Sequence, residues 1–228
     1  MAREAVIIVA GGSGTRMGAE LPKQFLPLGG VPLLVRTVRR VKEALPAAAV
    51  ITVLPRDHME LWKSIRREYL PGDIICVEGG DSRFSSVKHG LAAVPQDCDI
   101  VAVHDGVRPL ASKGLIRRVT ETARAEGTAV PVVEMVDSLR ETDGGASRIV
   151  DRSRFRAVQT PQAFRRDMIE RAYAAGYDPS FTDDASVVEA AGIAVTLCAG
   201  ERGNIKITTP EDLTVAEALL SRESTKGV

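Results

Sequence analysis

Aromatic residues make up only 4% of this 228-residue chain, and no apolar run approaches the ~20 residues that a membrane-spanning helix requires. The three cysteines, Cys76, Cys98 and Cys198, are widely separated and lack the spacing of a zinc site. We therefore expect free thiols in a reducing compartment, no disulfide framework and no membrane partner. An apolar segment begins after four residues, which leaves no room for a signal peptide, so we expect a cytoplasmic protein.

The chain also lacks an excess of charge of one sign, because 30 basic residues balance 30 acidic ones. No global field would then attract nucleic acid or an anionic membrane, so partners must be selected locally. With 44% hydrophobic residues, the chain can form one large domain that buries roughly 70 to 75% of its unfolded surface. We expect a single domain over residues 1–228.

Short β-branched segments alternate with longer helical patterns along the chain. This order is typical of βαβ units and predicts an α/β fold with a mostly parallel, twisted sheet flanked by helices. One amphipathic helix is expected over residues 34–45. The expected strands are 5–10, 49–54, 74–77, 100–103, 128–133 and 193–197.

A glycine-rich loop follows the first strand, with Gly11, Gly12 and Gly14 ahead of the cations Arg16 and Lys23. Glycines let backbone N–H groups approach an anion closely, which predicts a nucleotide triphosphate site. A dinucleotide-binding loop needs glycine or alanine three places after the last glycine, where this chain has methionine, and the Gly-Lys-Ser/Thr of a Walker A loop is absent. The remaining alternative is a tight turn with two solvated cations.

Two more groups follow predicted strands, at the edge where α/β proteins bind ligands. Gly80, Asp81 and Ser86 open the helix after residues 74–77, where Asp81 or Ser82 is also a natural N-cap. We expect short polar side chains and backbone groups here to recognise the nucleobase, since the low aromatic content argues against stacking as its main source.

The motif VHDGVRP places His104, Asp105 and Arg108 just past the strand at 100–103. A carboxylate there suits a metal ion or ribose hydroxyls, so Asp105 is a candidate metal ligand. We expect His104 to be packed at the strand end rather than to act as a base.

Near the C-terminus, the motif GNIKITTPEDL begins a helix at residue 210 with a capping box from Thr209 and Asp212. Lys206 lies between two isoleucines before that helix and interrupts an apolar strand, which favours a ligand contact over a snorkelling surface lysine. Two further segments are expected to start helices: Thr160-Pro161 and Thr182-Asp183-Asp184.

Between residues 137 and 156 the apolar residues thin out, and charges gather around the turn signal Asp143-Gly144-Gly145. The pattern predicts a protruding β-hairpin arm. Two strands alone are marginally stable in water, so we expect the arm to lie against a second subunit. A mobile surface loop is the alternative.

Taken in order, the motifs resemble those of the 2-C-methyl-D-erythritol 4-phosphate cytidylyltransferases over essentially the whole chain: AGGSGTRM, PKQF, GGDSRFSSV, VHDGVRP, DRSRF, TPQAF, TDDAS and GNIKITTPEDL. Closely similar motifs occur in the ribitol-5-phosphate cytidylyltransferases. The resemblance implies a Rossmann-like nucleotidyltransferase fold and a homodimer linked through the β-arms. It also implies a CTP- and Mg²⁺-dependent enzyme of non-mevalonate isoprenoid synthesis, which forms 4-diphosphocytidyl-2-C-methyl-D-erythritol and pyrophosphate.

The same resemblance implies that Arg16 and Lys23 stabilise the triphosphate and the transition state, while Arg152 and Lys206 position the polyol phosphate. The expected nucleotide contacts are Ala10, Gly11, Gly12, Gly14, Gly80, Asp81, Ser86 and Asp105. The expected acceptor contacts are Asp105, Arg108, Ser138, Arg152, Thr160, Thr182 and Lys206. Ser138 stands where many relatives have threonine, and Gly203 stands where some have aspartate.

These residue types suit the chemistry. The attacking phosphate monoester already carries about −1.5 to −2 charge near neutral pH, so no general base is needed. The obstacle is repulsion between two anions, which fixed cations, backbone donors and Mg²⁺ reduce. A catalytically silent nucleotide-binding module is a further alternative, but all four cations that the resemblance assigns to catalysis are present.

Overall fold

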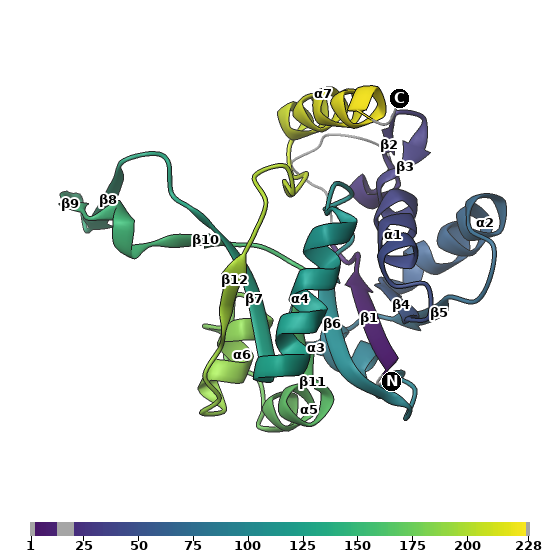
Figure 1. Cartoon of the computed structure of the whole chain (residues 1–228), viewed down its shortest axis with the longest axis horizontal. Helices are drawn as coiled ribbons and strands as arrows, with labels where there is room; N and C mark the ends of the chain where they lie inside the picture. Colours follow the sequence, from purple (N-terminus) through teal and green to yellow (C-terminus); the bar gives the residue numbers. More distant parts are fainter. Residues whose placement is uncertain (1–2, 13–20, 227–228) are drawn as a thin grey trace.

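The short apolar segments of the chain form one sheet, whose strands lie in the order β10-β7-β11-β6-β1-β4-β5, with β12 also paired to β7. The computed structural model describes residues 3–12 and 21–226, with side chains as far as residue 223. Helices cover both faces of this sheet, and a thin arm projects from one side (Figure 1). The strands are β1 (Arg3–Val9), β4 (Ala49–Leu54), β5 (Ile75–Glu78), β6 (Cys98–Asp105), β7 (Thr128–Glu134), β10 (Arg156–Val158), β11 (Gln162–Arg165) and β12 (Leu197–Ala199).

The central strands are parallel: β1 pairs with β4 on one side and with β6 on the other, and β4 pairs with β5. In this register Val9 lies opposite Asp105, so β1 and β6 end together. Among the described strands of this sheet, β10 and β11 run antiparallel to their neighbours. The predicted α/β fold with a mostly parallel sheet is confirmed.

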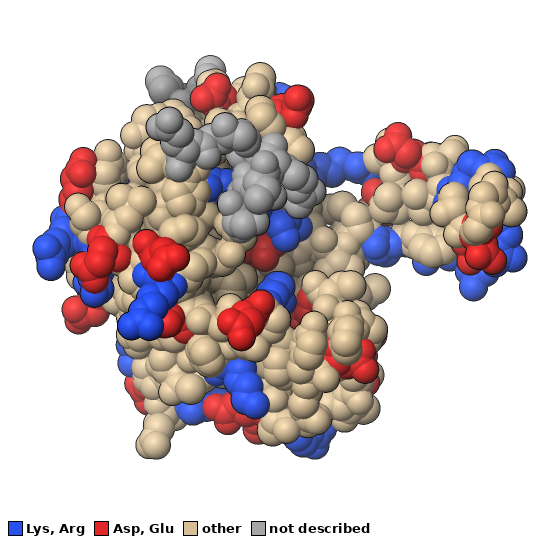
Figure 2. All heavy atoms as spheres, turned by 180° about the vertical axis from the view of Figure 1, so that it is seen from behind, with Lys and Arg blue, Asp and Glu red and all other residues tan. Residues whose placement is uncertain are grey.

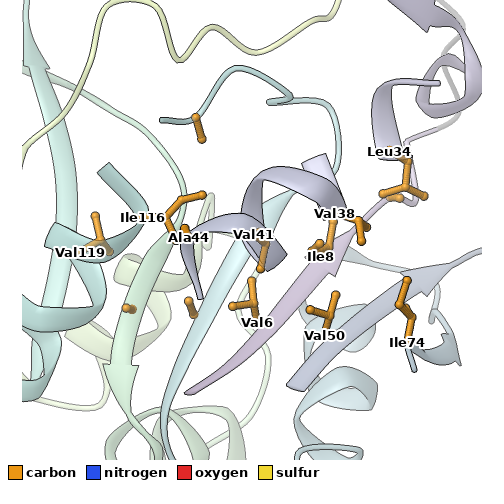
Figure 3. Packing of buried hydrophobic residues seen from close by; sticks show 14 of the residues in the cluster. Val6, Ile8, Leu34, Val38, Val41, Ala44, Val50, Ile74, Ile116 and Val119 are labelled. Carbon is orange, nitrogen blue, oxygen red and sulfur yellow. The ribbon is translucent and has the colours of Figure 1, made fainter. Parts of the chain in front are cut away.

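Alternate residues of β1 point to opposite faces of the sheet, as the period of a strand requires. Val6 and Ile8 pack against α1, α2 and α4, while Ala5 and Ile7 pack against α3, α5 and α6. Figure 3 shows the first layer, in which side chains of α1 face those of β1 and β4, and Ile116 of α4 lies beside Ala44 of α1. The helices are α1 (Leu33–Ala44), α2 (Met59–Tyr69), α3 (Arg83–Ala92), α4 (Lys113–Glu126), α5 (Arg166–Ala174), α6 (Asp184–Ala190) and α7 (Pro210–Lys226).

A third, smaller core lies under α7. This helix buries Ala216 against Leu28 and Leu33, and Ile207 reaches the same cluster from the segment before the helix. The predicted capping box is present, since Asp212 accepts from the Thr209 N–H and Thr209 Oγ1 accepts from the Asp212 N–H. Leu28 belongs to a small hairpin of β2 (Pro27–Leu28) and β3 (Val31–Pro32).

The predicted arm is confirmed as a hairpin of β8 (Leu139–Asp143) and β9 (Ala146–Val150) that stands away from the body (Figure 1). Gly144 and Gly145 form its two-residue turn with φ of 50° and 96°, a conformation that favours glycine. Figure 2 shows charges of both signs interspersed over the body and the arm, in keeping with the balanced composition. No helix of the described residues is long and apolar enough to cross a membrane.

Three predictions about local structure are wrong. Thr160-Pro161 does not start a helix but precedes strand β11, where Ala163 and Phe164 pair with β7. The strand expected at 193–197 begins only at Leu197, because residues 194 and 196 meet β7 partly through the Thr128 hydroxyl instead of a regular backbone ladder. Lys206 does not lie in a strand, since its segment is irregular and joins the body through a bond from the Ile207 N–H to the Val107 carbonyl (3.0 Å).

Candidate functional site

A cavity of about 300 Å³ opens at the carboxyl ends of β1, β4, β5 and β6. The loops after these strands continue the ladder for one more bond: the Ala10 N–H donates to Val53, Gly79 to Leu54 and Gly106 to Val9. These bonds hold the loop backbones beside one another. The described lining is Val9, Ala10, Gly11, Gly12, Lys23, Gln24, Pro55, Gly79, Gly80, Asp81, Ser82, Arg83, Ser86, Asp105, Val107 and Lys206.

Lys23 enters the cavity from a short 3₁₀ helix, η2 (Lys23–Phe25). Its side chain crosses the backbone at Gly12, where a Cβ atom would lie 2.8 Å from Lys23 Cε. An alanine at this position would therefore displace the end of the Lys23 side chain. Two of the predicted residues of this loop, Gly14 and Arg16, lie outside the described residues.

The loop between β5 and α3, which we expected to recognise the nucleobase, forms one side of the cavity. The Ser86 hydroxyl is buried, accepts a hydrogen bond from the Gly80 N–H (3.2 Å) and lies 3.4 Å from the Gly80 carbonyl oxygen. Ser82 caps α3 by accepting from the Ser85 N–H (3.0 Å), so Ser82 rather than Asp81 is the N-cap. The positive end of the α3 dipole thus faces the cavity, which favours negative charge there.

Arg83 also lines the cavity, although it was not among the site residues predicted from the sequence. Its guanidinium group binds Asp184 through two parallel bonds of 3.0 and 2.6 Å, and the Tyr173 hydroxyl donates to the same carboxylate. Although burial alone would lower the pKa of Arg83, Asp184 raises that pKa above its ordinary value. The partner lies far along the chain, so no local pattern could have indicated this pair.

Asp105 ends β6 with only 7% of its surface exposed. Its Oδ2 lies 3.0 Å from Lys206 Nζ and 3.4 Å from Arg108 Nε. Burial alone would raise the pKa of Asp105, but Lys206, Arg83 and Arg108 lower that pKa to about 2. The carboxylate is therefore ionised throughout the physiological range, and it holds the Lys206 ammonium group at the cavity.

Arg108 itself lies behind this pair and donates to the Asn204 carbonyl (2.7 Å), which ties the Lys206 segment to β6. Burial lowers the pKa of Arg108, while Asp105 opposes the change. Its side chain is thus used within the protein, and Arg108 does not belong to the described cavity lining.

Thr160 also lies behind the cavity wall. Its hydroxyl accepts a hydrogen bond from the Asp105 N–H (3.0 Å) and bonds His104 Nδ1 (2.9 Å). The His104 ring is fully buried, which confirms that it is packed at the strand end. Burial lowers its pKa to about 4, although the charge of Asp105 opposes that change. Thr160 therefore fixes the strand end that presents Asp105.

The other predicted acceptor contacts lie farther out. Thr182 borders a separate cavity of about 60 Å³ that shares Ser82 and Arg83 with the main one. Ser138 and Arg152 are exposed at the base of the arm, where the Arg152 guanidinium donates to the Val136 carbonyl. The structure thus brings most of the predicted nucleotide contacts and Lys206 together, but not Arg152.

The middle of the face shown in Figure 2 is hollowed, and basic and acidic side chains meet there. Among the residues lining the cavity, the cations Lys23, Arg83 and Lys206 outnumber the carboxylates Asp81 and Asp105. An arrangement of cations, backbone N–H groups and carboxylates can bind a polyphosphate together with a metal ion.

Comparison with known proteins agrees with this chemistry. Residues 4–222 match the family model IspD: 2-C-methyl-D-erythritol 4-phosphate cytidylyltransferase. A curated enzyme of that name from Bacteroides thetaiotaomicron is 46% identical over 219 residues, which cover 96% of this chain and 100% of the relative.

Two solved structures share the fold. The 4-diphosphocytidyl-2C-methyl-D-erythritol synthase of Anaerococcus prevotii has a TM-score of 0.84 and 30% identity, over 96% of both chains. The 2-C-methyl-D-erythritol 4-phosphate cytidylyltransferase of Thermus thermophilus has a TM-score of 0.75 and 35% identity, over 94% of this chain and 98% of the other. By its sequence over nearly its full length and by its fold, this chain belongs to the 2-C-methyl-D-erythritol 4-phosphate cytidylyltransferase family.

Proposed function

We propose that this chain transfers the cytidylyl group of CTP to 2-C-methyl-D-erythritol 4-phosphate. A phosphate oxygen of the acceptor attacks the α-phosphorus of CTP, the bond to the β-phosphate bridge breaks, and pyrophosphate leaves. The product is 4-diphosphocytidyl-2-C-methyl-D-erythritol, in the non-mevalonate synthesis of isoprenoid precursors. The observation that carries the proposal is the meeting of Lys23, Lys206 and Asp105 in one cavity of a chain from this family.

The mechanism needs electrostatic stabilisation rather than proton transfer, because the nucleophile is already an anion. Lys23 and Arg16 would bind the triphosphate and the charge that grows on departing pyrophosphate. Lys206 would hold the acceptor phosphate in line with the α-phosphorus, and Asp105 keeps the Lys206 ammonium in place. Positioning of two reactants in this way contributes much of the rate enhancement.

Backbone groups of Gly80 and the Ser86 hydroxyl line the end of the cavity that we assign to cytosine. Ala10, Gly11, Gly12, Gly14 and Asp81 would complete the nucleotide contacts. A pocket that bonds the cytosine edge leaves buried groups unpaired when uracil enters, which supplies selectivity for CTP.

Magnesium fits this site. Mg²⁺ is usually bound by one or two carboxylates together with substrate phosphates, and Asp105 is an ionised carboxylate of the cavity. Both cation contacts of Asp105 fall on Oδ2, so Oδ1 is the oxygen that we expect to bind the ion. The bound ion would neutralise charge on the α- and β-phosphates. The described residues contain no group of three or more His, Cys, Asp or Glu side chains that could hold a metal without substrate.

We further propose a homodimer in which the arm of each subunit completes the site of the other. Ile149 and Phe155 of the arm are 69% and 45% exposed and line one hollow on its surface, which supports contact with a partner. Arg152 lies on the same arm, outside the cavity of its own chain. It would bind the acceptor phosphate of the partner subunit, together with Ser138, while Arg108, Thr160 and Thr182 would shape the acceptor side from within.

The three cysteines are free thiols, which supports the proposal that the protein works in the cytoplasm. The test of the proposed reaction is pyrophosphate release from CTP and Mg²⁺, measured with each polyol phosphate in turn. We expect turnover with 2-C-methyl-D-erythritol 4-phosphate. Turnover with ribitol 5-phosphate alone would assign the chain to the alternative activity, and no turnover with either would support a silent binding module.

A further inference from the structure

Gln24, the residue after Lys23, is a polar side chain buried in the wall of the cavity. Only 1% of its surface is exposed, and its amide Nε2 lies 3.0 Å from Nδ1 of His58. Because an amide nitrogen only donates, the His58 nitrogen accepts this bond. Gln24 Oε1 has no hydrogen-bond partner among the described residues. A buried oxygen without a hydrogen-bond partner is destabilising, so stability alone does not account for glutamine at this position.

The helix η2 that carries Lys23 and Gln24 has only three residues. A 3₁₀ helix of this length has little stability of its own, so its position depends on what it packs against. Phe25 provides one anchor: it is buried, its ring stacks on Trp62 at 6.4 Å between centroids, and it meets the edge of His58 at 6.0 Å. Trp62 is in turn held by a 2.9 Å bond to Thr52.

The Gln24–His58 bond provides the second anchor, and it joins two walls of the cavity. His58 belongs to the 3₁₀ helix η3 (Arg56–His58), which follows β4 and begins at Pro55. The His58 N–H donates to the Pro55 carbonyl (3.0 Å), and both Pro55 and Lys23 line the cavity. The bond thus fixes the Lys23 segment against the end of a central strand.

We propose that Gln24 and His58 are positioning residues for Lys23. Their hydrogen bond sets the place of the Lys23 ammonium group, and they act on turnover through that group rather than by touching substrate. This inference rests on the proposed function, because it takes Lys23 as a transition-state cation.

A double-mutant cycle tests it. Gln24→Leu replaces the amide side chain by an apolar side chain of similar volume. We expect it to lower kcat about tenfold. In the Lys23→Ala background, the same change should lower kcat less than about twofold, since the group it positions is gone. An equal tenfold loss in both backgrounds would overturn the proposal, because Gln24 would then act independently of Lys23.

Two substitutions of His58 provide a second test, in which the conservative substitution should retain most of the activity. His58→Asn keeps a polar atom near the position of Nδ1, and we expect kcat within about threefold of wild type. His58→Leu keeps the bulk and loses the bond, and we expect a loss of about tenfold. Equal kcat values for the two variants would contradict the proposal.

Thr128→Val is the matched control, because it removes a buried hydroxyl that accepts from the Thr196 N–H (2.8 Å) at the start of β7, outside the described cavity lining, and leaves Gln24 and His58 unchanged. We expect a lower Tm and an unchanged kcat. Trp62 is the only tryptophan, so its fluorescence reports whether each variant keeps the packing around Phe25.

The same cycle is also measured as CTP affinity by calorimetry, which requires no acceptor. A non-additive cycle in CTP affinity supports the positioning role even if the wild type uses another acceptor. Wild-type turnover together with additive cycles in both kcat and affinity would overturn this inference alone, and leave the proposed reaction standing.

Discussion

Lys23 passes directly over Gly12: a Cβ atom at Gly12 would lie 2.8 Å from Lys23 Cε and 3.2 Å from Nζ. A methyl group there must displace the ammonium end of the lysine, which is flexible enough to move. The loop that supplies backbone N–H groups to the cavity thus also influences where the Lys23 ammonium group lies.

We therefore expect Gly12→Ala to lower kcat about tenfold, and Lys23→Ala to lower it on the order of 10² to 10³, with no large change in Tm. Arg16→Ala should resemble Lys23→Ala. Steady-state turnover at saturating CTP measures the effects. The matched control is Gly114→Ala, in α4, where the nearest atom to an added Cβ is the Ser112 hydroxyl at 3.5 Å. Near wild-type turnover of the Lys23 and Arg16 variants would refute their assignment.

The nucleobase loop predicts selectivity. If the Gly80 backbone and Ser86 bond the cytosine edge, CTP should exceed UTP and ATP in kcat/KM by at least about 10². Competition between CTP and UTP in one reaction measures the ratio. Equal use of the two nucleotides would show that this loop does not read the base.

The arm predicts a site shared between subunits. Arg152→Ala should raise KM for the polyol phosphate and leave CTP affinity nearly unchanged, because a guanidinium group binds phosphate through two bonds that alanine cannot make. Titration of each substrate separately distinguishes the two effects.

Mixed dimers extend the same prediction. When Arg152→Ala and Lys23→Ala chains are re-equilibrated, one of the two sites in each heterodimer combines an intact loop with an intact arm. Activity should then recover in the mixture. Confirmed heterodimers without recovery would show that Arg152 acts within its own chain or not in catalysis.

His104 predicts a pH dependence of stability. Its pKa falls from 6.5 to about 4 because the folded protein buries the ring, so between these values the unfolded chain binds a proton that the folded chain does not. Stability present above pH 6.5 is therefore lost as the pH falls toward 4. From pH 7 to pH 5 the loss amounts to about 2 kcal/mol.

Urea unfolding at both pH values, in EDTA, measures this loss. His104→Asn keeps an atom that can bond Thr160 and removes the titration. Between pH 7 and pH 5, the fall in its free energy of unfolding should therefore be smaller than the fall in the wild type, by about 2 kcal/mol. The same fall in both proteins would assign the pH dependence to other groups.

The central strands could be predicted because each is a short apolar run buried on both faces, so the signal is local. The segment after Thr160 could not. Its Thr-Pro start is typical of a helix, but Ala163 and Phe164 pair with β6 and β7, and that pairing outweighs local preference.

Some residues of the candidate site could likewise be predicted from the sequence, and others could not. Lys23, Asp105 and Lys206 belong to motifs that chemistry alone makes conspicuous, and the structure brings them to one cavity. Arg83 was missed because its partner, Asp184, lies 101 residues away. Gln24 was missed because its burial and its bond to His58 depend on how η3, distant in sequence, is placed.

All described residues that line the main cavity precede residue 108, except Lys206. The segment that carries Lys206 continues into α7, whose Ala216 covers Leu28 and Leu33. During synthesis on the ribosome, Leu28 and Leu33 would thus stay uncovered until the last part of the chain has emerged. A prematurely terminated chain would lack Lys206, to which we assign the acceptor phosphate, and would display the surface that chaperones and proteases recognise, so we expect incomplete copies to be inactive and to be degraded.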